Sequence, residues 1–129
     1  MTRRVTGLGG VFFKSGDPES LYQWYERHLG IRRDDPAAAI FRWRQAEEPG
    51  RPGSTVWSIF PANSTYFGPG PAGFMLNYRV ENLDAVLDAL EAEGVKVDER
   101  REKSEFGRFG WVTDPDGNRI ELWEPPEGQ

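Results

Sequence analysis

The stretch Asp114-Pro115-Asp116-Gly117-Asn118-Arg119-Ile120-Glu121-Leu122 joins a tight turn to the start of a β-strand. Asp and Pro favour such turns, and Gly117 stands where the backbone needs a positive φ. Beyond the turn, Ile120 and Leu122 alternate with Glu121, so the carboxylate must point away from the apolar face of the strand. The stretch therefore predicts a final strand over residues 118–124 with one acidic side chain on its second face.

A strand followed by a helix occurs twice before this stretch. Each copy has a β-prone run, then an N-cap residue (Asp17 or Asn82), then apolar residues at helical spacing, and ends at a glycine (Gly30 or Gly94). The two copies span residues 9–30 and 74–94. Because an internal repeat constrains the whole architecture, we expect two related halves.

The two halves overlay along most of their length. Val11 and Leu76 are 65 positions apart, and the late segments 57–60 and 120–123 are 63 apart. Further strands are predicted over residues 39–44, 54–60, 95–97 and 108–113. We interpret each half as β-α-β-β-β, an order for which the second half shows every strand.

One half cannot cover both faces of its own sheet, so we expect the two to complete each other. We interpret residues 1–129 as a single α+β domain, a size typical of one hydrophobic core. Its predicted parts are module one over about 7–60, a linker over 61–73 and module two over about 74–125.

Composition excludes several classes of partner. The chain has 16 Lys and Arg against 21 Asp and Glu, a formal charge of −5, which disfavours nucleic acid. No apolar run approaches the roughly 20 residues of a membrane span. The chain has no cysteine, which excludes disulfides and is compatible with the expected cytoplasmic location.

The paired modules and the Asp-Pro-Asp-Gly-Asn-x-Ile-Glu-Leu ending resemble the vicinal oxygen chelate superfamily over about residues 7–125. This superfamily includes glyoxalase I, the bleomycin resistance proteins and the extradiol dioxygenases. The resemblance implies a curved mixed sheet around a cavity. It also implies a homodimer, in which the cavity lies either within one chain or between two.

Metal-using members of that superfamily hold a divalent ion with up to four side chains. The equivalent positions here are Gly10, Ser58, Met75 and Glu121, of which only Glu121 is a good ligand. The single histidine, His28, falls on the first predicted helix, where we expect it to be exposed. The resemblance therefore implies a degenerate site, and we expect neither a metal nor another cofactor.

Strand alternation predicts which side chains face the cavity. The predicted apolar walls are Phe12, Phe60, Met75 and Trp123, and the predicted polar groups are Lys14, Ser58, Asn77, Arg79 and Glu121. Lys14 and Arg79 are equivalent in the two halves. They either hold an anionic ligand or neutralise Glu121, and beside two cations the pKa of that carboxyl would fall.

These observations leave three functions open. The first is metal-free binding of a small aromatic or anionic molecule in the cavity, as in the bleomycin resistance proteins. The second is a lyase or isomerase of the glyoxalase type, with Glu121 as catalytic general base and with or without a metal. The third is an interaction module that uses the Pro- and Gly-rich segment 61–73.

Overall fold

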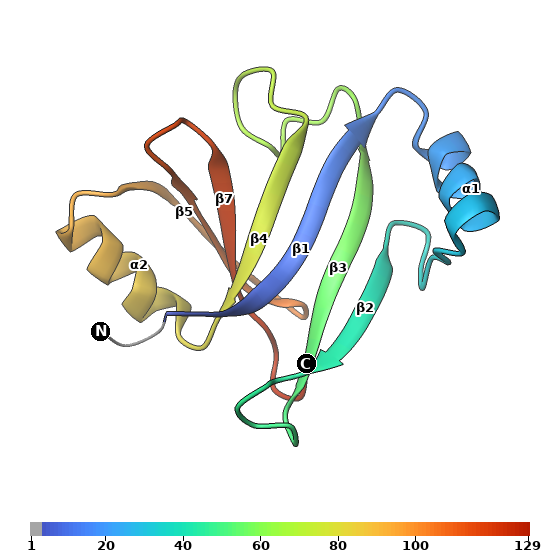
Figure 1. Cartoon of the computed structure of the whole chain (residues 1–129). Helices are drawn as coiled ribbons and strands as arrows, with labels where there is room; N and C mark the ends of the chain where they lie inside the picture. The colour runs from blue at the N-terminus through green and yellow to red at the C-terminus, as the bar shows by residue number, and fades with distance from the viewer. Residues whose placement is uncertain (1–3) are drawn as a thin grey trace.

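A computed structural model describes residues 4–129 of the chain. Seven strands form one mixed sheet in the order β2-β3-β1-β4-β7-β6-β5 (Figure 1). The elements are β1 (Val5–Ser15), α1 (Pro18–Leu29), β2 (Ala39–Arg44), β3 (Pro52–Pro61), β4 (Phe74–Val80), α2 (Leu83–Ala92), β5 (Lys96–Ser104), β6 (Gly107–Thr113) and β7 (Arg119–Glu124). The α+β class and the mixed sheet predicted from the sequence are confirmed.

The two halves meet at the centre of the sheet, where β1 and β4 pair antiparallel. Within each half the first strand pairs parallel with the last, so that Phe12 lies opposite Ser58 and Asn77 lies opposite Glu121. These two pairs are equivalent under the offsets of 65 and 63. The register of the sheet therefore confirms the overlay of the halves.

The helix ends follow the predicted capping residues. Asp17 accepts the main-chain N–H of Ser20 at 3.1 Å, and Asn82 accepts that of Ala85 at 3.1 Å. Gly30 closes α1 with a φ of 70°, a conformation that glycine adopts without steric cost. α1 packs on β1 and β3, and α2 packs on β5, β6 and β7, which leaves the outer face of β1 and β4 between the helices (Figure 1).

Two apolar clusters stabilise the two faces of the sheet. The cluster beneath α2 contains Val80, Leu83, Leu87, Val112 and Leu122. The cluster on the opposite, concave face contains Phe12, Phe67, Met75 and Trp111. Phe67 comes from the loop between β3 and β4, so this loop is part of the core of the concave face.

The first half has one strand fewer than predicted. Between α1 and β2, the described chain has only an isolated bridge between Asp35 and Ala38. Asp34 and Asp35 accept the main-chain N–H groups of Ile40 and Ala37, each at 2.7 Å. Pro36 has no N–H to donate. These side-chain bonds replace the ones a neighbouring strand would make.

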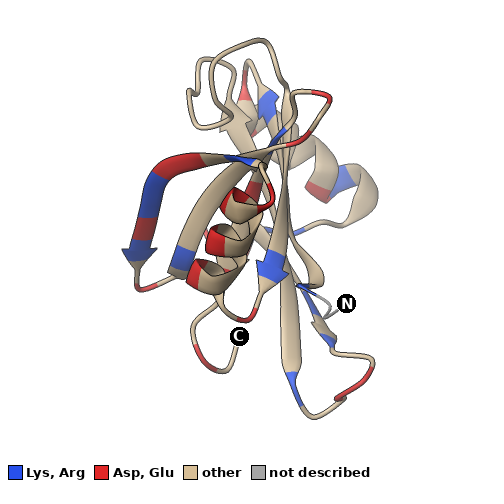
Figure 2. Ribbon diagram, turned by 90° about the vertical axis from the view of Figure 1, so that its left-hand side faces the viewer, with Lys and Arg blue, Asp and Glu red and all other residues tan. Residues whose placement is uncertain are grey.

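The fifth strand is longer than the predicted segment 95–97, although its sequence KVDERREKS is highly charged. β5 forms the edge of the sheet and pairs only with β6, so most of its charged side chains are exposed. Arg101 forms ion pairs with Asp84 at 2.8 Å and with Asp88 at 2.9 Å. Figure 2 shows the basic and acidic residues of β5 beside the acidic residues of α2. Charged edges also discourage pairing with another chain.

No helix in residues 4–129 is long and apolar enough to cross a membrane.

Candidate functional site

The concave face of the sheet holds a cavity of about 600 Å³. Both halves of the chain contribute to its walls. It is lined by Gly9, Phe12, Asp35, Ala37, Ala38, Ile40, Ser54, Val56, Ser58, Phe60, Tyr66, Asn77, Phe106, Phe109, Glu121, Trp123 and Gln129. Apolar and aromatic walls with a few polar groups are typical of small-molecule sites.

Aromatic rings form two walls of this cavity. On one side Phe60 stacks on Tyr66, with ring centroids 5.6 Å apart, and contacts Phe12 at 5.5 Å. On the other side Phe109 and Trp123 lie nearly parallel, with centroids 6.2 Å apart. The first pair comes from β3 and the loop after it, and the second comes from β6 and β7.

Glu121 lies at the base of the cavity and is 1% exposed. Its Oε2 accepts the indole N–H of Trp111 at 3.0 Å and the hydroxyl of Tyr66, while its Oε1 accepts the amide N–H of Asn77 at 2.6 Å. No Lys, Arg or His among residues 4–129 forms an ion pair with it. Neutral donors alone therefore hold this buried carboxyl.

Burial raises the pKa of Glu121 above the ordinary glutamate value. The hydrogen bonds from Tyr66, Asn77 and Trp111 act in the opposite direction, and the charge of Glu102 adds to the rise. Burial and the neighbouring carboxylate also raise the pKa of Tyr66, which therefore remains a hydrogen-bond donor at neutral pH.

Neither Lys14 nor Arg79 bonds Glu121 in the structure, so the lowered pKa expected for a carboxyl beside two cations does not arise. The Lys14 ammonium lies over the ring of Phe67, 5.2 Å from its centroid, and the Arg79 guanidinium bonds Ser54 and Gln129. The Arg79 guanidinium also lies over the ring of Trp123, 5.2 Å from its centroid.

Six of the nine residues predicted to face the cavity do line it: Phe12, Ser58, Phe60, Asn77, Glu121 and Trp123. Lys14, Met75 and Arg79 are not among the residues that line it. Met75 is 1% exposed because Phe67 and Trp111 cover it. Strand alternation gives the correct face for Met75, but not the side chains that the β3–β4 loop adds above it.

Sequence reasoning missed two partners of Glu121. Trp111 could have been found by counting back across the β6–β7 turn, since Trp111 lies directly opposite Glu121 in that hairpin. Tyr66 lies in the loop between β3 and β4 and reaches Glu121 across 55 positions of sequence. No local pattern marks Tyr66, because the contact depends on how the whole loop folds. His28 is exposed on α1, as predicted.

The sequence matches the model of the Glyoxalase/Bleomycin resistance protein/Dioxygenase superfamily over residues 11–122, which is most of the chain. The chain belongs to this superfamily. No curated protein sequence matches it.

The structure is similar to solved structures of other proteins. One of them is methylmalonyl-CoA epimerase from Mycobacterium tuberculosis, whose sequence is 23% identical and whose structure aligns with a TM-score of 0.66. That comparison covers 98% of this chain and 92% of the other. A Streptomyces coelicolor methylmalonyl-CoA epimerase in complex with 2-nitronate-propionyl-CoA is 13% identical with a TM-score of 0.72, covering 97% and 98%. At these identities the likeness shows the fold alone.

The divalent ion of the superfamily's metal-using branches does not fit the equivalent positions here. Ser58 donates its hydroxyl to the main-chain oxygen of Ala37, and Met75 is buried among apolar side chains. Gly10 has no donor, and a Cβ there would lie 2.7 Å from the ring of Phe12. Within residues 4–129, no three His, Cys, Asp or Glu side chains gather as a metal site.

Proposed function

We propose that this superfamily member binds a small aromatic molecule in its cavity without a metal. The observation that carries the proposal is the combination of aromatic walls with one buried carboxyl that no cation pairs. Among the described residues that line the cavity, only Asp35 and Glu121 have charged side chains. A negatively charged group inside the cavity would face two carboxylates, so the part of the ligand held there is neutral or cationic.

Two acceptors are available to such a ligand. Asn77 Oδ1 is buried at the cavity wall and has no partner among the described residues. Glu121 Oε1 accepts one hydrogen bond, from Asn77, and retains a second lone pair. Because an unsatisfied buried acceptor is costly, these atoms favour a ligand with an N–H or O–H donor attached to its aromatic part.

A fluorescence titration with N-phenyl-1-naphthylamine tests this proposal, since this probe is aromatic, uncharged and carries one N–H. We expect saturable binding of one probe per chain. Val56 lines the cavity, whereas Val11 follows the opposite parity on the neighbouring strand. Val56→Phe should abolish binding and Val11→Phe should preserve it. Equal binding by the two variants, or no saturable binding by the wild type, would contradict the proposal.

A second candidate function is proton transfer by Glu121, as in a lyase or isomerase. The raised pKa of this carboxyl brings it closer to the range in which a carboxylate is an effective base at neutral pH. Since two of the similar structures are methylmalonyl-CoA epimerases, deuterium incorporation into methylmalonyl-CoA in D₂O is the direct assay. Incorporation that disappears in Glu121→Gln would support this candidate, and absence of incorporation would exclude it for this substrate.

The homodimer is also a proposal. Phe74 is 68% exposed and Leu76 is 39% exposed, on the face of β4 opposite Asn77 and between the two helices. A second copy of the chain would cover them. Light scattering of the purified protein should give a molar mass twice that of one chain. Phe74→Ser should reduce the measured mass to that of one chain. A monomeric wild type would contradict the proposal. We likewise propose a cytoplasmic location, which cell fractionation tests.

A further inference from the structure

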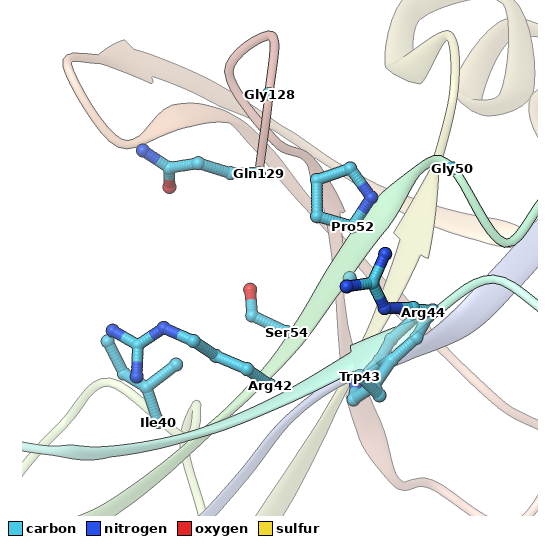
Figure 3. Close-up of a pocket in the computed structure, with 10 residues that line it drawn as sticks. Ile40, Arg42, Trp43, Arg44, Gly50, Pro52, Ser54, Gly128 and Gln129 are labelled. Atoms are coloured by element: carbon cyan, nitrogen blue, oxygen red, sulfur yellow. The ribbon is translucent and has the colours of Figure 1, made fainter.

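The charges around the cavity are unevenly distributed. Asp35 and Glu121 line it, whereas no Lys, Arg or His among the described residues does so. The cations Arg42 and Arg44 line a different groove of about 780 Å³, which adjoins the cavity at Ser54 (Figure 3). A charged group inside the cavity would therefore meet carboxylates, which favour a positive charge there.

Asp35 has no partner cation, although its neighbour in the sequence has one. Asp34 forms an ion pair with Arg42 at 3.4 Å, but within residues 4–129 no ion pair is formed by Asp35. Oδ1 of Asp35 accepts the main-chain N–H of Ala37 at 2.7 Å. Because the Asp35 side chain is exposed, a positive charge beside it would keep part of its hydration.

The segment that carries Asp35 is fixed to the rest of the fold. The main-chain oxygen of Ala37 accepts the hydroxyl of Tyr22 at 2.7 Å and also that of Ser58. Tyr22 belongs to α1 and is 4% exposed, and Ser58 belongs to β3 and lies opposite Phe12 in the sheet. Hydrogen bonds to two elements therefore hold the Asp35 carboxylate within the lining of the cavity.

Aromatic rings provide a second attraction for a cation. The face of an aromatic ring carries partial negative charge and attracts a cation within about 6 Å of its centroid. Phe106 is 65% exposed although it lines the cavity, and its main-chain oxygen accepts the indole N–H of Trp123 at 2.8 Å. The rings in the lining are those of Phe12, Phe60, Tyr66, Phe106, Phe109 and Trp123.

A buried acceptor in the same lining independently favours a ligand. Asn77 is 2% exposed, and its Oδ1 has no partner within the part of the chain that the structure describes. A buried acceptor left without a donor is costly, and a donor group on a ligand would remove this cost. This observation does not depend on the charges of Asp35 and Glu121.

We propose that the ligand of this cavity is an arylalkyl amine in its protonated form, with its ring between the aromatic walls and its ammonium group beside Asp35. The inference rests on the proposed function and names the class of ligand. The ammonium group lies at Asp35 and not at Glu121, because Glu121 is 1% exposed and already accepts three hydrogen bonds. Burial beside Glu121 would remove the hydration of the ammonium group.

Three naphthalene compounds that differ in the charge of one substituent test this ligand class. At neutral pH 1-naphthylmethylamine is a cation, 1-naphthylmethanol is uncharged and 1-naphthylacetate is an anion. Isothermal titration calorimetry measures the dissociation constant of each, and displacement of N-phenyl-1-naphthylamine shows that each occupies the cavity. We expect the amine to bind about 10-fold more tightly than the alcohol, and the acetate to bind most weakly.

Two matched variants separate the role of Asp35 from that of net charge. Asp35→Asn keeps an oxygen for the Ala37 N–H and removes the charge. It should remove most of the preference for the amine and leave the affinity for the alcohol unchanged. Asp116 is exposed in the turn between β6 and β7 and does not line the cavity, so Asp116→Asn should retain the full preference.

The results distinguish this inference from the proposed function. Equal binding of the amine and the alcohol, or an unchanged preference in Asp35→Asn, would overturn the ligand class and leave the proposed function standing. A preference that Asp116→Asn reduces as much as Asp35→Asn would show that the formal charge of −5 alone attracts the amine, and would also overturn it. Absence of saturable binding by all three compounds and by N-phenyl-1-naphthylamine would contradict the proposed function itself.

Discussion

The indole N–H of Trp111 meets Oε2 of Glu121 at 3.0 Å, and each of these side chains is 1% exposed. They lie directly opposite each other on β6 and β7. The bond places a carboxyl at the base of an aromatic cavity and supports it with a neutral donor rather than a cation. In a position where the metal-using relatives have a ligand, this chain has a side chain whose hydrogen bonds are made within the protein.

The stability of the fold should depend on the ionisation of Glu121. Folding raises the pKa of this carboxyl, so the folded chain binds its proton more tightly than the unfolded chain does. The resulting stability is fully present below the ordinary glutamate pKa and is lost as pH rises through the higher pKa of the folded state. Urea unfolding of the wild type from pH 4 to pH 8 should show this loss, relative to Glu121→Gln. A difference between the two proteins that does not change with pH would contradict it.

Removal of the Tyr66 hydroxyl should destabilise the protein and raise the pKa of Glu121 further. Tyr66→Phe deletes one of three hydrogen-bond donors to a buried carboxyl. Such a loss typically lowers the free energy of unfolding by about 1–3 kcal/mol. Tyr25→Phe is the control, because the contacts given for Tyr25 are made by its ring. In urea unfolding, Tyr25→Phe should lower the free energy of unfolding by less than about 0.5 kcal/mol. Equal losses in both would mean that the hydroxyl of Tyr66 contributes little.

Gly9 should not tolerate even one methyl group. A Cβ at Gly9 would lie 2.1 Å from Oδ1 of Asn77 and 3.0 Å from both the Arg79 and Trp123 side chains. Gly9→Ala would displace Asn77 from Glu121, and overpacking of this kind costs about 1–3 kcal/mol. A Cβ at Gly16 meets nothing within 4 Å, so Gly16→Ala should cost nothing measurable by thermal unfolding. A Gly9→Ala protein as stable as the wild type would show that Asn77 has room to move.

Divalent metals should not bind at Glu121 with one ion per chain. Its Oε2 already accepts two hydrogen bonds, and the other three equivalent positions offer no suitable donor. We expect equilibrium dialysis against Ni²⁺, Zn²⁺, Mn²⁺ or Fe²⁺, followed by elemental analysis, to give the same low content for the wild type and Glu121→Gln. Stoichiometric metal in the wild type that Glu121→Gln loses would overturn the metal-free account.

The sequence predicted the elements whose signals are local. Asp17, Asn82 and Gly30 mark helix ends because capping depends on a few neighbouring residues. The alternation around Glu121 and around Asn77 predicted that both side chains face the cavity, and the register of β4 and β7 places the two opposite each other. These features need only short-range geometry and one repeat.

The parts of the site that the sequence did not predict depend on distant segments. Tyr66 and Phe67 enter the concave face from a loop whose own residues give no periodic signal. Phe67 helps to bury Met75 and lies against Lys14. No cation then pairs with Glu121, and the pKa of this carboxyl is raised instead of lowered. The predicted length of β5 is too short because a charged sequence has low β-propensity. Pairing with β6 and contacts with α2 determine the length of this strand instead.

The most direct test of the central claim uses the indole N–H signals of the five tryptophans. Trp111 and Trp123 donate their indole N–H groups to Glu121 and Phe106 at the cavity, whereas Trp24 and Trp57 pack with the α1 residue Tyr25 on the other side of the sheet. On titration of the ¹⁵N-labelled protein with N-phenyl-1-naphthylamine, the Trp111 and Trp123 signals should shift together with one saturation curve while those of Trp24 and Trp57 stay in place. Saturable shifts confined to Trp24 and Trp57 would place the binding site outside the cavity and contradict the account.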